Sequence, residues 1–128
     1  MRLLLDTHLL LWAAGQPKKL PAAARKLIAN PRNSLCFSAA SLWEIAIKNA
    51  LGRDDFQADP GVLRRGLLES GYEELPITGD HAMAVAVLPA LHGGPFDRML
   101  VAQAAVEGMT LVTADAQVAK YPGSIRRV

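Results

Sequence analysis

Four acidic residues stand beside or inside apolar segments, where a charged side chain is costly unless it has a function. Asp6 closes the apolar run at 3–5, Glu44 interrupts a second run, Asp97 opens a third and Asp115 follows a fourth. If the fold brings these four carboxylates together, their mutual repulsion requires a counter-charge. Carboxylate oxygens suit hard divalent cations, so Mg²⁺ or Mn²⁺ is the natural candidate, and no Cys/His spacing suits zinc.

Each acid also has an ordinary structural explanation. Asp6 and Asp115 could each cap a following helix through backbone amides. Asp97 lies in the first turn of an expected helix, where the helix dipole favours a negative charge. Glu44 could pair with Lys48, four residues further along the same helix. Each explanation is adequate for its own residue. If all four were correct, however, the placement of all four acids beside apolar runs would be a coincidence.

Composition narrows the class of protein. The 128 residues predict one domain, 1–128, and 51% hydrophobic residues with a net charge of +2 do not indicate a general nucleic-acid coat. Cys36 is the only cysteine, so no internal disulfide can form, and we expect it to be a buried strand residue. An acid at position 6 comes too early for a signal peptide, and no apolar stretch approaches the roughly 20 residues of a membrane span. We therefore expect a soluble, cytoplasmic protein without membrane contact.

Apolar periodicity alternates between two patterns along the chain, and this alternation predicts an α/β fold. We expect a three-layer α/β/α domain with a mainly parallel sheet of five strands. The expected loops are at 15–20, 52–59 and 89–95. Strands are expected at 2–5, 35–37, 72–75, 109–112 and 124–128, and helices at 7–15, 22–29, 43–51, 60–71, 78–88 and 97–106.

Open α/β sheets bind ligands outside the carboxyl ends of their strands. Asp6 follows the first expected strand and Asp115 follows the fourth, so both face one crevice if these strands are neighbours. Glu44 lies on the helix after the second strand, and Ser41 and Lys48 share its face at helical spacing. Lys48 and Arg98 are the cations nearest the acids in sequence and are candidate contacts for a polyanionic ligand; Arg98 could instead pair with a neighbouring carboxylate.

Other residue types are assigned to structure. The three histidines, His8, His81 and His92, lack a mutual spacing that indicates metal ligation, so none is expected to be catalytic. A group of large apolar residues is expected to lie in the core rather than at an interface: Leu9, Leu10, Trp12, Trp43 and Ile47.

Four segments together resemble the PIN domain, and most of all the VapC-type toxins of bacterial toxin–antitoxin pairs. The resemblance covers essentially the whole chain, in order, and four such motifs in sequence are specific where one alone is weak. The segments are LLDTH (4–8), SAASLWEI (38–45), PFDRMLVAQA (95–104) and LVTAD (111–115).

The resemblance implies a metal-dependent endoribonuclease that acts as a toxin, with RNA as substrate, a VapB-type antitoxin as partner and a homodimeric state. Lys48 and Arg98 would then contact the RNA. The family pattern places its acids at the four positions chosen above, with Asp6, Asp97 and Asp115 as direct metal ligands and Glu44 binding through water or activating the nucleophile. Thr7, Thr113 and Ser41 would orient carboxylates or metal-bound water. One departure stands at Gly94, where relatives of this type often have an aspartate.

Two rival functions remain open. An aspartyl-phosphate enzyme also places acids at strand ends, but no second Asp follows Asp6 by two residues and no lysine ends the final strand. A catalytically silent PIN-like module that binds RNA or protein is the other rival, and Gly94 is the residue that favours it.

Overall fold

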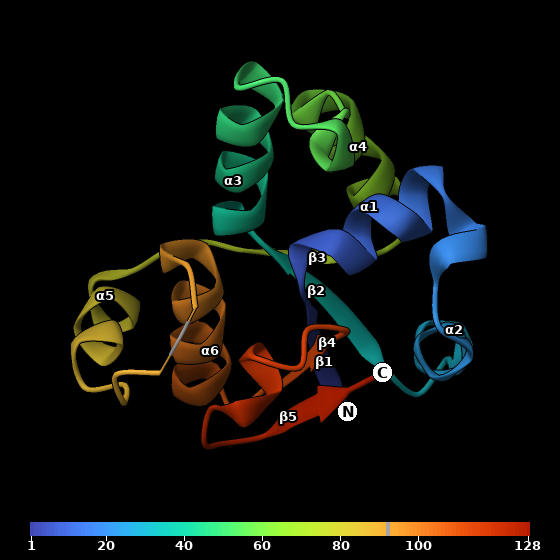
Figure 1. Cartoon of the computed structure of the whole chain (residues 1–128). Coiled ribbons are helices and arrows are strands. Elements are labelled where there is room, and N and C mark those ends of the chain that lie inside the picture. The colour runs from blue at the N-terminus through green and yellow to red at the C-terminus, as the bar shows by residue number, and fades with distance from the viewer. Residues whose placement is uncertain (92) are drawn as a thin grey trace.

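Five short strands form one parallel sheet at the centre of the computed structural model, which describes residues 1–91 and 93–128. The strand order is β3-β2-β1-β4-β5, and Leu4 at its centre is in register with Cys36 and Leu111. His92 lies outside the described residues. The strands are β1 (Arg2–Leu5), β2 (Ser34–Ser38), β3 (Glu73–Leu75), β4 (Thr110–Thr113) and β5 (Ile125–Arg127) (Figure 1).

Six α-helices connect the strands, and their ends follow ordinary capping rules. Ser38 caps the helix after β2, while Pro95 opens the last helix and Gly108, at φ +67°, ends it in the left-handed conformation. The helices are α1 (Thr7–Gly15), α2 (Ala22–Ala29), α3 (Ala39–Ala50), α4 (Pro60–Glu69), α5 (Gly79–Ala86) and α6 (Pro95–Glu107), with 3₁₀ turns η1 (Pro17–Lys19), η2 (Asp54–Phe56) and η3 (Val118–Lys120).

The expected elements are confirmed, with small shifts at their ends. The expected helices at 60–71 and 78–88 end two residues early, at Glu69 and Ala86. Gly71, at φ +89°, has a backbone conformation that a helix does not use. The loops expected at 15–20 and 52–59 each contain a 3₁₀ turn. The sheet is wholly rather than mainly parallel, because all four strand pairs are parallel.

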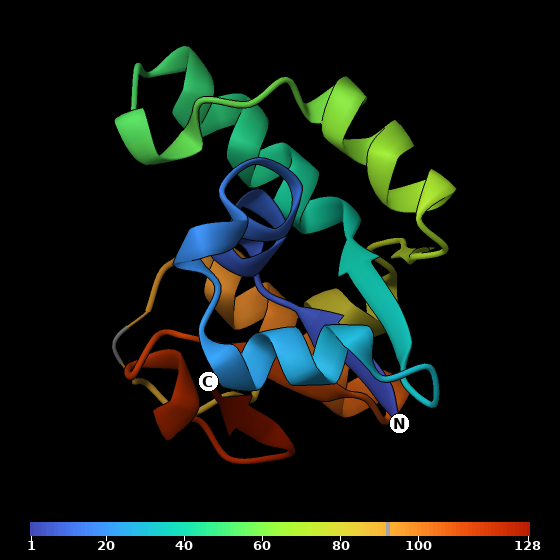
Figure 2. The same ribbon diagram turned by 90° about the vertical axis from the view of Figure 1, so that its right-hand side faces the viewer.

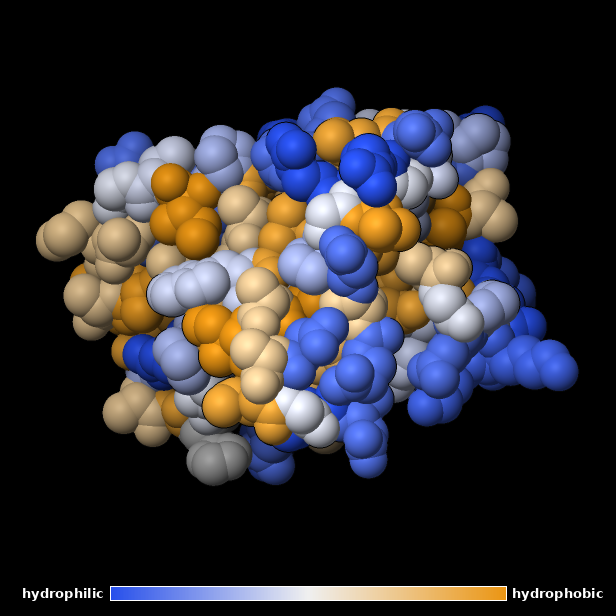
Figure 3. All heavy atoms as spheres, turned by 90° about the horizontal axis from the view of Figure 1, so that it is seen from above, coloured by the Kyte–Doolittle hydropathy of each residue, from blue (hydrophilic) through white to orange (hydrophobic). Residues whose placement is uncertain are grey.

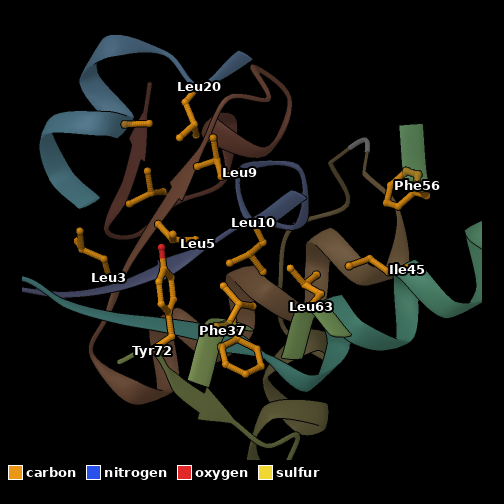
Figure 4. Packing of buried hydrophobic residues seen from close by; sticks show 13 residues of the cluster. Leu3, Leu5, Leu9, Leu10, Leu20, Phe37, Ile45, Phe56, Leu63 and Tyr72 are labelled. Atoms are coloured by element: carbon orange, nitrogen blue, oxygen red, sulfur yellow. The ribbon is translucent and has the colours of Figure 1, made fainter. Parts of the chain in front are cut away.

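Side chains of alternate strand residues point to opposite faces of the sheet, and each face has its own core. Leu3 and Leu5 lie in a cluster under α1, α2 and α4 that includes Phe37 (Figure 4). Leu4 points the other way, into a cluster covered by α6. The two helical layers are visible on either side of the sheet in Figures 1 and 2. The three-layer α/β/α arrangement is therefore confirmed.

Two residues expected in the core are instead on the surface. Trp43 is 59% exposed and Ile47 is 38% exposed, whereas Leu9 and Leu10 are fully buried and Trp12 is half-buried. In Figure 1, α3 rises beyond the sheet. Ile45 is fully buried, whereas the Trp43 ring lies at the surface, 5.2 Å from the ring of Phe96. The expectation for Trp43 and Ile47 was wrong because α3 carries apolar residues on more faces than the fold covers.

The strand order brings the ends of β1 and β4 together. From β1 the chain adds β2 and β3 on one side, and then β4 and β5 on the other. The change of direction between β1 and β4 is the switch point at which open α/β sheets form a ligand crevice. The expectation that these two strands are neighbours is confirmed. No helix within the described ranges is both long and apolar enough to cross a membrane.

Candidate active site

Asp6 occupies the end of β1 and is the N-cap of α1. Its Oδ1 accepts the backbone N–H of Leu9 at 3.1 Å, and its Oδ2 accepts the hydroxyl of Thr113 from the end of β4. The side chain is only 6% exposed. Burial raises the pKa of Asp6, and the two hydrogen bonds oppose this rise. The capping role considered from the sequence is therefore present, but it uses only one of the two carboxylate oxygens.

Glu44 is buried on α3, beside the start of α1. The Thr7 hydroxyl donates to Glu44 Oε1 at 2.6 Å, and Ser41 Oγ lies 2.9 Å from the same hydroxyl oxygen. Lys48 Nζ donates to the other oxygen, Oε2, at 2.5 Å. The pairing with Lys48 that the helical spacing predicts is therefore present, and it compensates a carboxylate that is only 4% exposed.

Asp97 lies in the first turn of α6 and is half-buried. Its pKa is raised to about 6, first by burial and then by the charges of Glu44, Asp115 and Asp6, with Lys48 acting in the opposite direction. These charges act on Asp97 because the other three carboxylates lie within electrostatic range of it. The four acids predicted from the sequence therefore share one site.

Asp115 is the most open of the four acids. Its backbone N–H donates to Thr113 Oγ1 at 3.0 Å, and its Oδ1 accepts the N–H of Gln117 at 2.8 Å. Thr113 thus contacts Asp6 through its proton and Asp115 through its oxygen. A cavity of about 230 Å³ lies between the two acids, lined by Asp6, His8, Trp12, Ala114 and Asp115.

Two residues that line this cavity were missed by the sequence analysis. His8 is the second residue of α1, and its Nε2 is 3.2 Å from Asp55 Oδ2. The ring of Trp12 lies 5.8 Å from the ring of His8, at the spacing of the next helical turn. Their position in the helix that Asp6 caps is the signal that could have placed them at the site.

The two cations proposed as RNA contacts have different surroundings. Lys48 lies at the acids, 4.6 Å from the centre of the Phe56 ring as well as beside Glu44. Among the described residues, Arg98 has no carboxylate partner, and it donates to the carbonyl of Pro89 at 2.9 Å and to the Tyr121 hydroxyl at 2.8 Å. Arg98 therefore ties α6 to the segment before it and to the residue after η3.

The donor set suits a hard divalent cation. All four acidic groups offer only carboxylate oxygens, and the charges of Glu44, Asp115 and Asp6 add to burial in raising the pKa of Asp97, a repulsion that such an ion would offset. In the part of the chain that the structure describes, no three His, Cys, Asp or Glu side chains stand close enough to enclose an ion as they are oriented. An ion would therefore have to draw the carboxylates closer together.

Comparison with known proteins supports the same reading of the fold. Structures similar over nearly their whole length include a chain of the DNA-bound VapBC2 complex of Rickettsia felis, with a TM-score of 0.71, 18% identity and coverage of 99% of this chain and 98% of that one. A chain of the DNA-bound VapBC complex of Salmonella typhimurium has a TM-score of 0.63, 19% identity and coverage of 100% and 97%. A chain of VapBC-1 of nontypeable Haemophilus influenzae has a TM-score of 0.60 and 20% identity, with coverage of 94% of this chain and 91% of that one.

A search among curated proteins finds no match. The PIN domain model matches residues 3–124, a range that contains all four acids and both hydroxyls that bond to them. The resemblance seen in the sequence is confirmed, and the chain belongs to the PIN domain family.

Proposed function

We propose that the protein is a metal-dependent endoribonuclease that hydrolyses RNA phosphodiester bonds, and that it is the toxin of a toxin–antitoxin pair that arrests translation or growth. The observation that carries this proposal is the set of four carboxylates at the switch point of the sheet, where burial first, and then the charges of the other three acids, raise the pKa of Asp97 to about 6. Membership of the PIN family, a class of nucleases that generally use divalent metals, supports the activity. The fold shared with chains of VapBC complexes supports the biological role.

Asp6, Asp97 and Asp115 would hold Mg²⁺ or Mn²⁺ directly, and Glu44 would act through a water molecule. When bound, the ion supplies an activated water nucleophile and offsets the charge that builds on the phosphate. The raised pKa of Asp97 means that ion binding competes with a proton at this carboxylate, so protons are released when the ion binds near pH 6.

The hydroxyls fix the carboxylates before any ion arrives. Thr113 holds Asp6 Oδ2, and Thr7 holds Glu44 Oε1. Ser41 lies against Thr7 and completes this support. Each of these contacts leaves a carboxylate with fewer orientations, which lowers the entropy lost when the ion binds.

RNA must approach the acids past a positive charge. Lys48 is at the acids and partly exposed, so we assign it a contact with the RNA phosphate. Arg98 stays the second candidate contact, but its guanidinium already bonds to Pro89 and Tyr121. We therefore expect a smaller contribution to RNA binding from Arg98.

An apolar surface next to the site supports a homodimer. A cavity of about 500 Å³ between α3, α5 and α6 is lined by Trp43, Phe96 and Met99, among others. Met83 on α5 is 72% exposed, and Val87, the C-cap residue after α5, is 82% exposed. Figure 3 shows apolar side chains gathered on the α5 and α6 side of the molecule, opposite a largely hydrophilic side. We propose that a second copy covers this surface, and light scattering of wild type and Met83→Lys tests it.

We further propose a VapB-type antitoxin as partner, in the cytoplasm. A segment of that partner carrying arginine would bind the four carboxylates by charge-assisted hydrogen bonds and exclude RNA. Titration of the purified toxin with such an antitoxin should abolish RNA cleavage, and Asp97→Asn should weaken the complex.

The direct test is incubation of the purified protein with RNA and Mg²⁺ or Mn²⁺. Wild type should cleave internal phosphodiester bonds, while Asp6→Asn and Asp97→Asn should not. Cleavage that persists in both variants would show a contaminating nuclease and remove the site assignment. EDTA should stop the wild-type reaction, and added Mg²⁺ should restore it.

A catalytically silent PIN-like module is the second candidate. Two observations favour it: Gly94 stands where relatives of this type often have an aspartate, and the described acids do not form a ready-made cage. This candidate predicts RNA binding without cleavage at any Mn²⁺ concentration, and a melting temperature that Mg²⁺ and Mn²⁺ leave unchanged.

A further inference from the structure

A buried chain of hydrogen bonds lies beneath the acidic site, and the proposed function leaves it without a role. We propose that Gln103 is a positioning residue that fixes the N-terminus of α3 against α6, and so sets the separation of Glu44 and Asp97. This inference rests on the proposed metal site and adds a residue that does not itself contact the ion.

Gln103 is fully buried on α6, six residues after Asp97. Its Oε1 accepts the hydroxyl of Ser38 at 2.6 Å, and Ser38 Oγ in turn accepts the N–H of Ala40 at 3.0 Å in the first turn of α3. Its Nε2 donates to the carbonyl of Pro76, after β3, at 3.3 Å. One side chain therefore connects α6 with the last residue of β2, the start of α3 and the segment after β3.

His81 extends the chain to α5. The backbone N–H of Thr78 can only donate, and it lies 3.0 Å from His81 Nδ1, so this nitrogen is the acceptor. The ring proton is then on Nε2, which donates to Glu107 Oε2 at 2.8 Å at the end of α6. Gln103 Nε2 also lies 3.4 Å from Nδ1. The orientation of Gln103 is thereby fixed, with its oxygen toward Ser38.

The connected elements are the ones that carry two of the acids. Glu44 lies on α3, Asp97 lies on α6, and the base of α3 meets α6 in Figure 1. Apolar packing alone holds two helices together but permits small shifts along the contact, whereas a buried hydrogen bond specifies one position. The mutual repulsion of Glu44 and Asp97 favours separation of these helices. The Ser38–Gln103 bond opposes it.

The test uses Gln103→Met, which keeps the volume of the side chain and removes both hydrogen bonds. Calorimetric titration with Mn²⁺ should show roughly tenfold weaker binding than in wild type, the order found when outer partners of a metal site are lost. RNA cleavage should show a lower kcat with little change in KM. The Ala40 amide proton should exchange faster with solvent than in wild type, because its acceptor Ser38 Oγ is no longer held by Gln103.

Two further variants separate positioning from stability. Leu67→Ala removes a buried side chain in the cluster on the other face of the sheet, so it destabilises the fold and should leave Mn²⁺ affinity unchanged. Ser38→Ala breaks the same bond from the other side. Its effect on Mn²⁺ affinity and that of Gln103→Met should be strongly non-additive in the double variant.

The outcomes are distinct. If wild type itself binds no Mn²⁺, the proposed function fails, and the inference fails with it. If wild type binds Mn²⁺ and folded Gln103→Met and Ser38→Ala bind it equally well, the positioning role is wrong while the metal site stands. Equal losses of affinity in Leu67→Ala would likewise overturn it, because they would reflect general destabilisation.

Discussion

The four acids divide into a buried pair and an open pair. Asp6 and Glu44 are 6% and 4% exposed, and each is held by a hydroxyl from another element. Asp97 is half-buried and Asp115 is exposed. Among the described residues, no hydrogen bond to the Asp97 carboxylate is found, and the Asp115 carboxylate accepts one only from the nearby backbone N–H of Gln117. The buried pair is thus fixed by tertiary contacts, while the open pair is accessible from solvent, where the proposed ion and RNA would bind.

This difference indicates a division of labour within one site. A carboxylate that must stay charged inside the protein needs permanent donors, and Thr7, Thr113 and Lys48 supply them. The unrelieved repulsion is concentrated on Asp97, whose pKa is raised to about 6. Changes to the buried pair should therefore act on the stability of the fold, and changes to the open pair should act on ion binding and catalysis.

The largest effect is expected for Asp97→Asn. We expect RNA cleavage to fall by at least about 10²-fold, because the variant loses charge where the transition state needs a bound cation. In the absence of metal the melting temperature should rise, because one of four repelling charges is removed. Cleavage assays and thermal melting in EDTA measure the two effects. A lower melting temperature in EDTA would contradict the claim that repulsion from the other three acids at Asp97 destabilises the metal-free fold.

Replacement of the hydroxyl that supports Asp6 should lower the stability of the metal-free protein, whereas Asp97→Asn should raise it. Thr113→Val leaves a buried carboxylate without one donor, so the free energy of unfolding should fall by about 1–3 kcal/mol. The matched control is Thr110→Val on the same strand, whose hydroxyl bonds to Ser124 at the surface and whose loss should cost less than about 0.5 kcal/mol. Urea unfolding in EDTA measures both. Equal losses of stability in Thr113→Val and Thr110→Val would show that the buried acid Asp6 does not depend on its hydroxyl donor.

The contribution of Asp97 to stability should be visible in the pH dependence of the free energy of unfolding. Its folded-state pKa is about 6 against an ordinary 3.8, so the folded state holds this proton more tightly than the unfolded chain does. The resulting stabilisation is complete at low pH and is lost as pH rises from about 4 to about 6. Unfolding of wild type and Asp97→Asn in EDTA should therefore diverge over this interval. Saturating Mg²⁺ should reverse the trend.

Gly94→Asp should strengthen Mn²⁺ binding next to Asp97, a member of the open pair. A side chain at position 94 would begin 3.9 Å from Asp97 Oδ2, and the backbone there, at φ −74°, accepts any residue. A fifth acid adds ligand charge, so Mn²⁺ affinity should rise by roughly two- to tenfold. It also gives α6 the side-chain cap that it lacks. Calorimetry on this variant and on Gly94→Ala distinguishes the added charge from the added Cβ.

The smallest effect on RNA cleavage is expected for Lys48→Met. The variant leaves the buried Glu44 carboxylate without its counter-charge, so the free energy of unfolding should fall by about 1–3 kcal/mol. The KM for RNA should rise a few-fold as a phosphate contact is lost, about the effect of one exposed cation. Lys26→Met on α2 is the control and should change neither quantity. An unchanged KM in Lys48→Met would show that this lysine does not contact the RNA.

The sequence alone was sufficient to locate the acids. The apolar runs before Asp6 and Asp115 specify buried strands, and parallel strands end at one edge of a sheet whatever the details of packing. Helical spacing likewise predicted the Glu44–Lys48 contact, because residues four apart on a helix are neighbours. These features follow from local periodicity, so a single chain without relatives carries them.

Only the tertiary structure decided which side chains meet across the sequence. Thr113 bonds to Asp6 across 107 positions and Ser38 to Gln103 across 65, and no local pattern encodes either contact. The exposure of Trp43 was misjudged for the same reason: an apolar residue can be buried only where another element covers it. The division between buried and open acids depends on such long-range contacts. Local periodicity thus determined where the charges lie along the chain, and packing decided which of them the fold itself holds in place.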